Sequence, residues 1–320
     1  MEQNLLKTAA AAREGLGNAG EVLGDNMGTA PRYELFHAAA SICSQKVRAV
    51  LAHHALPYVS QSLNIFDGQT YLPDYVRLRM LGCARYGGAL VSHHSGSTST
   101  AAGGCDGAVV PTLIDWQAGE VIVDSHRMCQ YLDDQKPQQQ RLRPHHLTAS
   151  IDGEMEIVDN LPNYQMLMGR AVSGAESEVI REGIGSVLSQ KKVGWCDCYL
   201  AEFPADDILV AAYSAKRAKE LSAVDHLFAP DAMQAAYDRA EGALISLDRK
   251  LDQRHTIWLF SDDPTMADLF WGIALLRMKN IGAEHFWSNG RLPHVENFCA
   301  MAAKMPAIKV AVIDWPGALY

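Results

Sequence analysis

Apolar and polar positions follow two different spacings along this chain. Between residues 32 and 136, short apolar runs alternate with a helical stretch. A strand-like run beginning at Tyr33 leads into a segment in which Val47, Val50 and Leu51 recur at helical spacing, and an alternating run follows. This part of the chain is therefore predicted to begin with a β-α-β unit.

Two further β-rich runs, at residues 109–115 and 121–123, are joined by a turn at Ala118 and Gly119 and precede a short helical pattern. They predict a hairpin and a closing helix. Ahead of them, residues from about 82 to 107 are rich in Gly, Ser and Thr and show little periodicity, which predicts a long insertion.

After a linker rich in Pro, Gln and Arg, residues 145–320 show helical spacing with scarcely a strand signal. Thr265 and Asp268 have the spacing of a capping box at the start of one of these helices. The second domain is thus predicted to be all-helical. Residues 1–31 are Ala/Gly-rich with a weak helical pattern, and we expect an extension that lies on the surface or is partly mobile.

Composition excludes several classes of function. The chain has 320 residues, 48% of them hydrophobic, and a net charge of −9, so nucleic acid is a poor partner. No apolar run approaches the roughly 20 residues that span a bilayer, and no secretory signal precedes the seven cysteines. We expect a soluble, cytoplasmic protein with reduced thiols and no membrane association.

A metal site is not expected. Adjacent histidines such as His53 and His54 would point about 100° apart on a helix and would not form a two-ligand face. Cys196 and Cys198 have no second cysteine pair to complete a ligand set, so they are interpreted as a structural pair.

Cys43 is the main candidate for chemistry, because it lies where the first strand hands over to a helix. A helix N-terminus stabilises a thiolate, so the pKa of this thiol is expected to be lowered. Ser41 can cap the same helix or donate its hydroxyl to a second thiolate. Residues 41–48 alone leave open an alternative, in which a capping serine stands beside an inert buried cysteine.

Two more features accompany this segment. Pro111 follows a β run, where a proline is tolerated at a sheet edge or as a cis peptide bond. Asp124 and Ser125 stand at the start of the next helix, where a carboxylate and a hydroxyl could bind an amino acid's charged groups. Helix capping alone is the alternative for this pair.

Taken in order, these motifs and the following helical domain resemble the glutathione transferase superfamily, from about Tyr33 onward. The resemblance implies a thioredoxin-like α/β domain (residues 32–136) followed by an all-α domain, with glutathione as co-substrate. It also implies that Val110 and Pro111 form a cis bond facing the cysteinyl unit of glutathione, and that Asp124 and Ser125 hold its γ-glutamyl end.

The segments SICSQKVR, PDYVRLR, VVPTL and LFWGIALLRM are similar to those of glutathione-dependent reductive dehalogenases of chlorinated hydroquinones. By this resemblance, a glutathione thiolate replaces halide on the ring, Cys43 removes the sulfur as a Cys43-glutathione mixed disulfide, and a second glutathione resolves it. Ser41 would then hydrogen-bond the attacking thiolate.

Other functions use the same site. They are glutathione-dependent aryl-ether cleavage, reduction of a glutathionyl aromatic and isomerisation, and outside catalysis a transferase-like binding module with a silent thiol. The partners expected are glutathione and a small aromatic, with a homodimer implied by the relatives.

Overall fold

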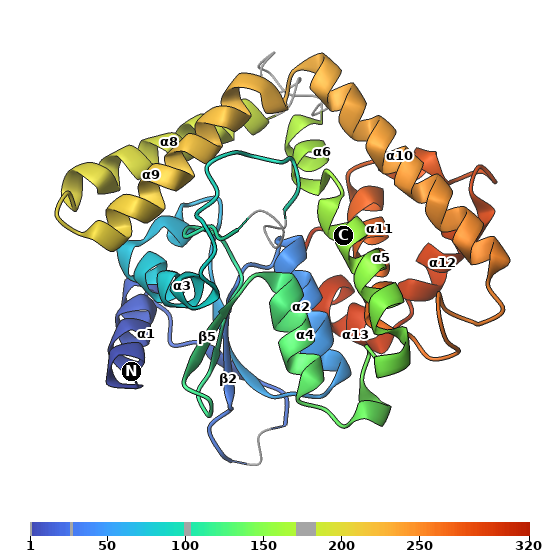
Figure 1. Ribbon diagram of the computed structural model, residues 1–320, viewed down its shortest axis with the longest axis horizontal. Coiled ribbons are helices and arrows are strands. Elements are labelled where there is room, and N and C mark those ends of the chain that lie inside the picture. The colour runs from blue at the N-terminus through green and yellow to red at the C-terminus, as the bar shows by residue number, and fades with distance from the viewer. Residues whose placement is uncertain (1, 26–27, 99–103, 171–183) are drawn as a thin grey trace.

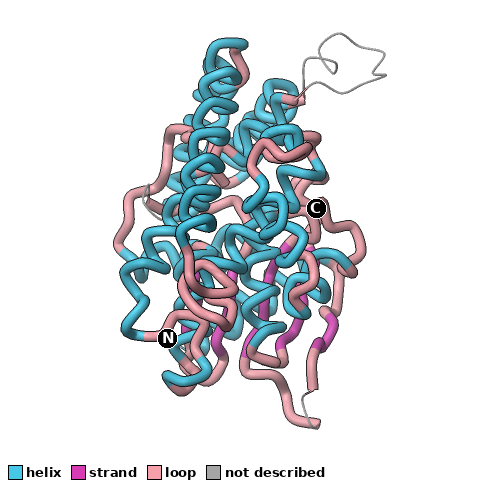
Figure 2. Tube along the Cα trace, turned by 90° about the vertical axis from the view of Figure 1, so that its right-hand side faces the viewer, coloured by secondary structure: helices cyan, strands magenta, loops and turns pink. Residues whose placement is uncertain are grey.

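The computed structural model describes residues 2–25, 28–98, 104–170 and 184–320 and has an α/β layer beneath a larger helical layer (Figures 1 and 2). Figure 2 shows the strands gathered in the lower half and helices filling the upper half. The strands are β1 (Glu21–Leu23), β2 (Tyr33–His37), β3 (Tyr58–Ser62), β4 (Thr112–Asp115) and β5 (Glu120–Val123).

The strands form one mixed sheet in the order β1-β3-β2-β4-β5. β2 pairs parallel with β3 and antiparallel with β4, and β4 and β5 form the predicted hairpin. All five side chains of β2 are buried, as expected for a central strand covered on both faces. The predicted β-α-β start and the predicted hairpin are confirmed.

The helices of the first domain cover both faces of the sheet. α1 packs against α3 on one face, and α2 packs against α4 on the other. α2 also contacts α11 and α13 of the helical domain, so it lies between the sheet and the second domain. These helices are α1 (Glu2–Leu16), α2 (Ile42–His53), α3 (Pro73–Tyr86) and α4 (Ser125–Asp134).

Every regular element described after α4 is helical, as predicted. Thr265 and Asp268 form the expected capping box at the start of α11, whose Phe270 and Trp271 are buried. No helix in the described ranges is long and apolar enough to span a bilayer. The α-helices described after α4 are α5 (Thr148–Asn160), α6 (Asn163–Gly169), α8 (Gly185–Glu202), α9 (Asp207–Ser222), α10 (Pro230–Gln253), α11 (Met266–Asn280), α12 (Pro293–Ala302) and α13 (Pro306–Ile308).

The N-terminal extension is more integrated than predicted. Leu5, Ala9 and Leu16 of α1 are buried in a hydrophobic cluster with α3 and the sheet, and β1 pairs antiparallel with β3. Arg13 forms a two-pronged ion pair with the buried Glu34 of β2, at 2.8 Å for each bond. The description of residues 1–31 as a surface extension was therefore wrong for α1, because its weak apolar pattern is enough to cover the sheet.

The predicted insertion begins later than expected. α3 continues to Tyr86, so the first residues assigned to the insertion, from about 82, are helical. Gly82 lies inside α3, where it allows close packing against β5: a Cβ there would stand 2.6 Å from Cγ1 of Val123. Beyond Gly87 the described chain runs mostly without regular structure, except for a bridge between Leu90 and Cys105. Residues 99–103 lie outside the described ranges.

Candidate active site

Cys43 lies in the first turn of α2, which follows β2 in the chain and begins near the end of that strand. Ser41 is the N-cap residue, and its Oγ accepts a hydrogen bond from the Ser44 backbone N–H at 3.3 Å. This cap forms because the extended backbone of Ser41 aims its hydroxyl at the open N–H groups of the helix. The predicted strand, cap and thiol are thus arranged as the sequence indicated.

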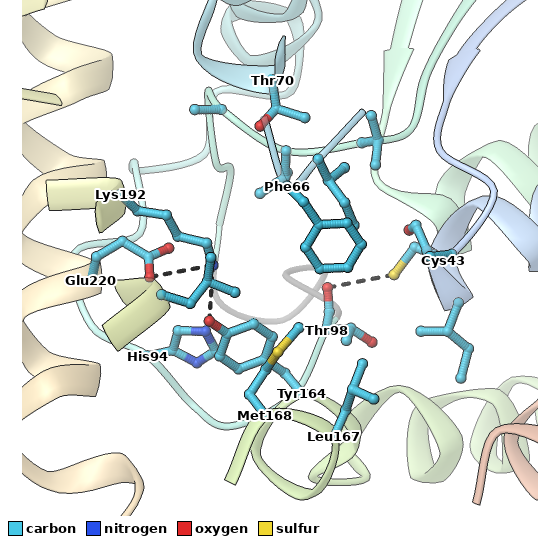
Figure 3. Close-up of a pocket in the computed structure, with 18 of the residues that line it drawn as sticks. Cys43, Phe66, Thr70, His94, Thr98, Tyr164, Leu167, Met168, Lys192 and Glu220 are labelled. Carbon is cyan, nitrogen blue, oxygen red and sulfur yellow. Dashed lines mark hydrogen bonds and ion pairs between the residues drawn. The ribbon is translucent and has the colours of Figure 1, made fainter. Parts of the chain in front are cut away.

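The Cys43 side chain is buried, and its Sγ lies 3.5 Å from the Thr98 carbonyl oxygen (Figure 3). Burial raises the pKa of the Cys43 thiol, while Lys46 and the Ser125 hydroxyl act to lower it. The expectation that the helix N-terminus would lower this pKa was therefore wrong, since removal from water outweighs the favourable charges. The Cys43 thiol therefore needs a nearby positive charge or a base to form the reactive thiolate.

Lys46, which the sequence alone did not single out as a functional residue, is one source of positive charge. Its ammonium is buried one turn after Cys43 and lies 2.6 Å from Oδ1 of Asp159, on α5. His126 holds the other oxygen of Asp159 at 2.7 Å, and the Phe270 ring lies 4.5 Å from the Lys46 ammonium. A buried charged chain thus connects α2, α4 and α5 beneath the thiol.

Lys46 and Asp159 are held in their ionised forms. Burial acts to raise the pKa of Asp159, but Lys46 and His126 outweigh it and the pKa is lowered. Burial acts to lower the pKa of Lys46, but Asp159 and Cys43 outweigh it and the pKa is raised. Lys46 is thus a paired lysine whose charge also acts on Cys43.

The peptide bond between Val110 and Pro111 is cis, as the family resemblance implied. Buried Arg79 of α3 donates to the carbonyl of Pro111 and, at 3.1 Å, to Oγ1 of Thr112. Val110 lines the same cavity as Cys43 and Ser41. Three of the predicted site residues are therefore brought together around one space.

Asp124 and Ser125 are placed differently. Asp124 caps α4, with Oδ1 accepting from the backbone N–H groups of His126 and Arg127 at 3.0 and 3.3 Å. The Ser125 hydroxyl is buried and makes no hydrogen bond to any residue within the described ranges. It nevertheless lies close enough to influence the pKa of Cys43. Neither residue borders the cavity that Cys43 lines; Asp124 caps α4, and the glutathione role of both residues stays a prediction.

The cavity extends from Cys43 toward the helical domain and encloses about 850 Å³, including the part open to solvent. Phe66, Leu167 and Met168 form apolar surfaces within it, and His94, Tyr164 and Lys192 lie on the side away from Cys43 (Figure 3). A cavity with apolar walls and a few convergent polar groups is typical of a small-molecule site. Its apolar walls suit an aromatic compound.

Comparison with known proteins decides the family. The sequence matches the glutathione S-transferase N-terminal domain over residues 40–135 and the C-terminal domain over residues 230–300. It is 33% identical over 290 residues to 2,5-dichlorohydroquinone reductive dechlorinases from two strains of Sphingobium indicum, covering 90% of this chain and 84% of each relative. The chain belongs to the glutathione S-transferase family.

Solved structures of this family have the same fold. A beta-etherase from Sphingobium sp. strain SYK-6 superposes with a TM-score of 0.56 at 14% identity, covering 88% of this chain and 98% of that one. A glutathione S-transferase from Methylobacillus flagellatus KT, solved with glutathione bound, gives 0.51 at 14% identity, covering 87% and 98%. The predicted membership of the family and the similarity to the reductive dehalogenases are confirmed.

Proposed function

We propose that this glutathione S-transferase is a glutathione-dependent reductive dehalogenase of halogenated hydroquinone-like aromatics that works through a Cys43-glutathione mixed disulfide. The observation that carries the proposal is the position of Cys43. It lies at the start of α2 on a cavity with apolar surfaces that Ser41 and Val110 also line. The named activity of the relatives at 33% identity supports the same chemistry.

The reaction has three sulfur-transfer steps. A glutathione thiolate adds to the electron-poor tautomer of the ring, a C–S bond forms, and halide leaves with the electron pair of the broken bond. The Cys43 thiolate then attacks the sulfur of the conjugate, so that an S–S bond forms, the aryl C–S bond breaks and the ring carbon takes a proton. A second glutathione thiolate releases Cys43 and leaves as oxidised glutathione. Two glutathiones thus supply the two electrons that reduce the carbon–halogen bond.

Glutathione is proposed to bind across the first domain. The backbone at Val110 and Pro111 would pair with its cysteinyl unit, and Asp124 and Ser125 would hold its γ-glutamyl end. Both hydrogen bonds within the described residues that Asp124 accepts go to Oδ1, which leaves Oδ2 for an ammonium group. The unpartnered hydroxyl of Ser125 is a matching polar group for the carboxylate of the same unit.

The proposal is tested by following chloride, oxidised glutathione and aromatic products during turnover of 2,5-dichlorohydroquinone. Cys43→Ser should still release chloride but accumulate the glutathionyl aromatic, because a serine hydroxyl is hardly ionised at neutral pH and forms no disulfide. Ser41→Ala should slow chloride release and leave little conjugate. Cys198→Ser, at an exposed cysteine of α8, is the matched control. Normal reduced product from Cys43→Ser would show that the thiol is a bystander.

The glutathione site has its own test. Asp124→Asn keeps the oxygen that caps α4 but removes the charge, so it should weaken glutathione binding by about tenfold or more in calorimetric titration. Asp206→Asn is a matched control, because Asp206 caps α9 with the same pair of backbone bonds and does not border the main cavity. Equal affinities for wild type and Asp124→Asn would remove Asp124 from the site.

We also propose that the protein is a cytoplasmic homodimer, as the family resemblance implied. Light scattering at micromolar concentration should give twice the 35.0 kDa mass of the chain. Fractionation of cells that express the protein should place it with the cytoplasmic proteins. The mass of a monomer would contradict the homodimer. Recovery of the protein with the membranes would contradict the cytoplasmic location.

A further inference from the structure

A group of buried charges lines the cavity on the side away from Cys43. The lysine cluster consists of Lys192 on α8 and Lys216 and Lys219 on α9, and all three border the cavity. Asp106 and Glu220 are its acidic partners. Asp106 comes from the end of the insertion, so segments distant in the sequence meet here (Figure 3 shows Lys192 and Glu220).

The ion pairs of the cluster share two carboxylates among three ammonium groups. Oδ2 of Asp106 receives Lys216 at 2.9 Å and Lys219 at 3.0 Å. Glu220 receives Lys216 at 3.0 Å and Lys192 at 3.5 Å. Both carboxyls are ionised, because burial acts to raise their pKa values but the lysines lower them, to about 2 for Glu220.

Within the described residues, the three lysines of the cluster therefore outnumber its two carboxylates by one, and burial lowers the pKa of Lys219. Burial lowers the pKa of neighbouring His94 well below its usual value, so that ring adds no charge at neutral pH. Arg79, also buried, donates to the backbone carbonyl of Asp106 at 2.6 Å and adds positive charge to this region. A buried charge without a partner is costly, and this cost falls when an anion occupies the adjacent space.

The cluster also has hydrogen-bond donors to spare. Within the described ranges the Lys219 ammonium donates to Asp106 alone, which leaves two of its three N–H groups unused. Lys192 donates to the Tyr164 hydroxyl at 2.8 Å and pairs with Glu220, which leaves one. These ammonium groups border the cavity and are nearly buried, with exposed side-chain fractions of 8% for Lys219 and 13% for Lys192.

We propose that the lysine cluster is a subsite for an anionic oxygen on the aromatic substrate. This rests on the proposed function only in placing an aromatic ring in the cavity. The apolar surfaces of Phe66, Leu167 and Met168 lie between Lys192 and Cys43 in Figure 3, so a ring among them has one edge toward the ammonium groups and the other toward the thiol. The oxygen is a phenolate or a ring carboxylate.

The cluster draws on a part of the chain outside the two family matches. Its three lysines and Glu220 lie between residues 135 and 230, the segment that separates the two matched domains. The thiol and the cis-proline bond lie inside the first match. The ammonium groups of the subsite thus come from a segment that neither family model covers, whereas Asp106 lies inside the first match.

Binding of unreactive anions tests the subsite without turnover. Calorimetric titrations use pentachlorophenol, which is a phenolate at neutral pH, and 4-chlorobenzoate, each against its neutral methyl ether or ester. Wild type should bind at least one anion about tenfold more tightly than its neutral form, and whichever anion shows the preference identifies the oxygen. Lys219→Met should abolish the preference, Lys219→Arg should restore most of it, and the exposed Lys304→Met should leave it unchanged.

Lys219→Met leaves Asp106 paired with Lys216, so the variant is expected to fold, which circular dichroism checks. If it does not fold, Lys192→Met takes its place. The proposal is overturned if neutral and anionic forms bind wild type equally, or if the preference survives in the folded lysine variant. If the wild-type protein shows the anion preference but no reductive dehalogenation, only the proposed function is refuted.

Discussion

Lys46→Met removes the ammonium group that neutralises Asp159 beneath Cys43. The Lys46 ammonium and the Asp159 carboxylate are 2.6 Å apart, and both side chains are buried. Breaking a buried ion pair by deleting one partner costs about 3–5 kcal/mol of unfolding free energy. His126 still bonds Asp159 at 2.7 Å, so we expect the lower end, about 3 kcal/mol. A domain with a typical stability of about 5–15 kcal/mol would remain folded.

The loss should depend on pH in a defined direction. The pKa of Asp159 is lowered in the folded state, so its contribution is present above the unfolded value of about 3.9 and is lost as the pH falls through the folded value. The pKa of Lys46 is raised, so its contribution is present below about 10.4 and is lost as the pH rises through the folded value. The pair is therefore intact at neutral pH, where the penalty of Lys46→Met should be largest.

Urea unfolding followed by tryptophan fluorescence measures the effect at pH 7 and about one pH unit below the unfolded pKa of Asp159, where its contribution is being lost. Lys46→Met/Asp159→Asn should recover at least half of the loss, because no buried carboxylate then lacks its cation. Lys304→Met changes the net charge equally at an exposed position and should have little effect. A penalty below about 1 kcal/mol, or one that the second substitution fails to relieve, would refute the argument.

The same substitution should slow alkylation of Cys43. Lys46 is the strongest of the groups that lower the pKa of this thiol, so its loss raises the pKa further and reduces the thiolate fraction. At a pH below the pKa of the thiol, each unit by which the pKa rises reduces the thiolate fraction about tenfold. Iodoacetamide labelling, quantified at Cys43 by mass spectrometry, provides the rate. Equal rates in wild type and variant would mean that Lys46 acts only on stability.

Three further substitutions test the fold by urea unfolding. Leu5→Ala should cost about 2–4 kcal/mol if α1 is part of the core, whereas Leu6→Ala, at a side chain 51% exposed, should change little; equal effects would place α1 outside the core. Gly82→Ala forces a methyl against β5 and should cost about 1–3 kcal/mol, while Gly153→Ala, with open space around it, should be neutral or stabilising. Thr265→Ala should cost about 1–2 kcal/mol by removing the α11 cap, and Thr265→Ser should retain most of it.

Features fixed by local sequence could be predicted, and those fixed by distant partners could not. Ser41, Cys43 and the capping box of α11 depend on residues a few positions apart, so their spacing was informative. Lys46 pairs with a carboxylate 113 positions away, and Lys216 with one 110 positions away. A lysine in an amphipathic helix has the same local pattern whether it is solvated or buried, so both were beyond a single-sequence prediction.

The pKa of Cys43 shows the same limit. The helix start is local and favours the thiolate, but burial comes from long-range packing that brings Thr98 and Ser125 to the thiol. The helix start can be predicted from the sequence, whereas the burial cannot, and burial has the larger effect on the pKa of Cys43. The role of α1 was missed for a related reason, because about one small or apolar residue per turn is a weak pattern until the position of the sheet is known.

The three-residue strand β1 changes how the sheet meets other molecules. Without it, β3 would offer an open row of backbone N–H and C=O groups to any extended chain, the arrangement from which edge-to-edge aggregation begins. With it, the outermost strand is short, carries Glu21, and ends at Gly24, whose φ of +84° turns the chain away. The N-terminal segment therefore covers the open edge of β3, and a chain that lacks β1 but still contains β2 should be prone to aggregation.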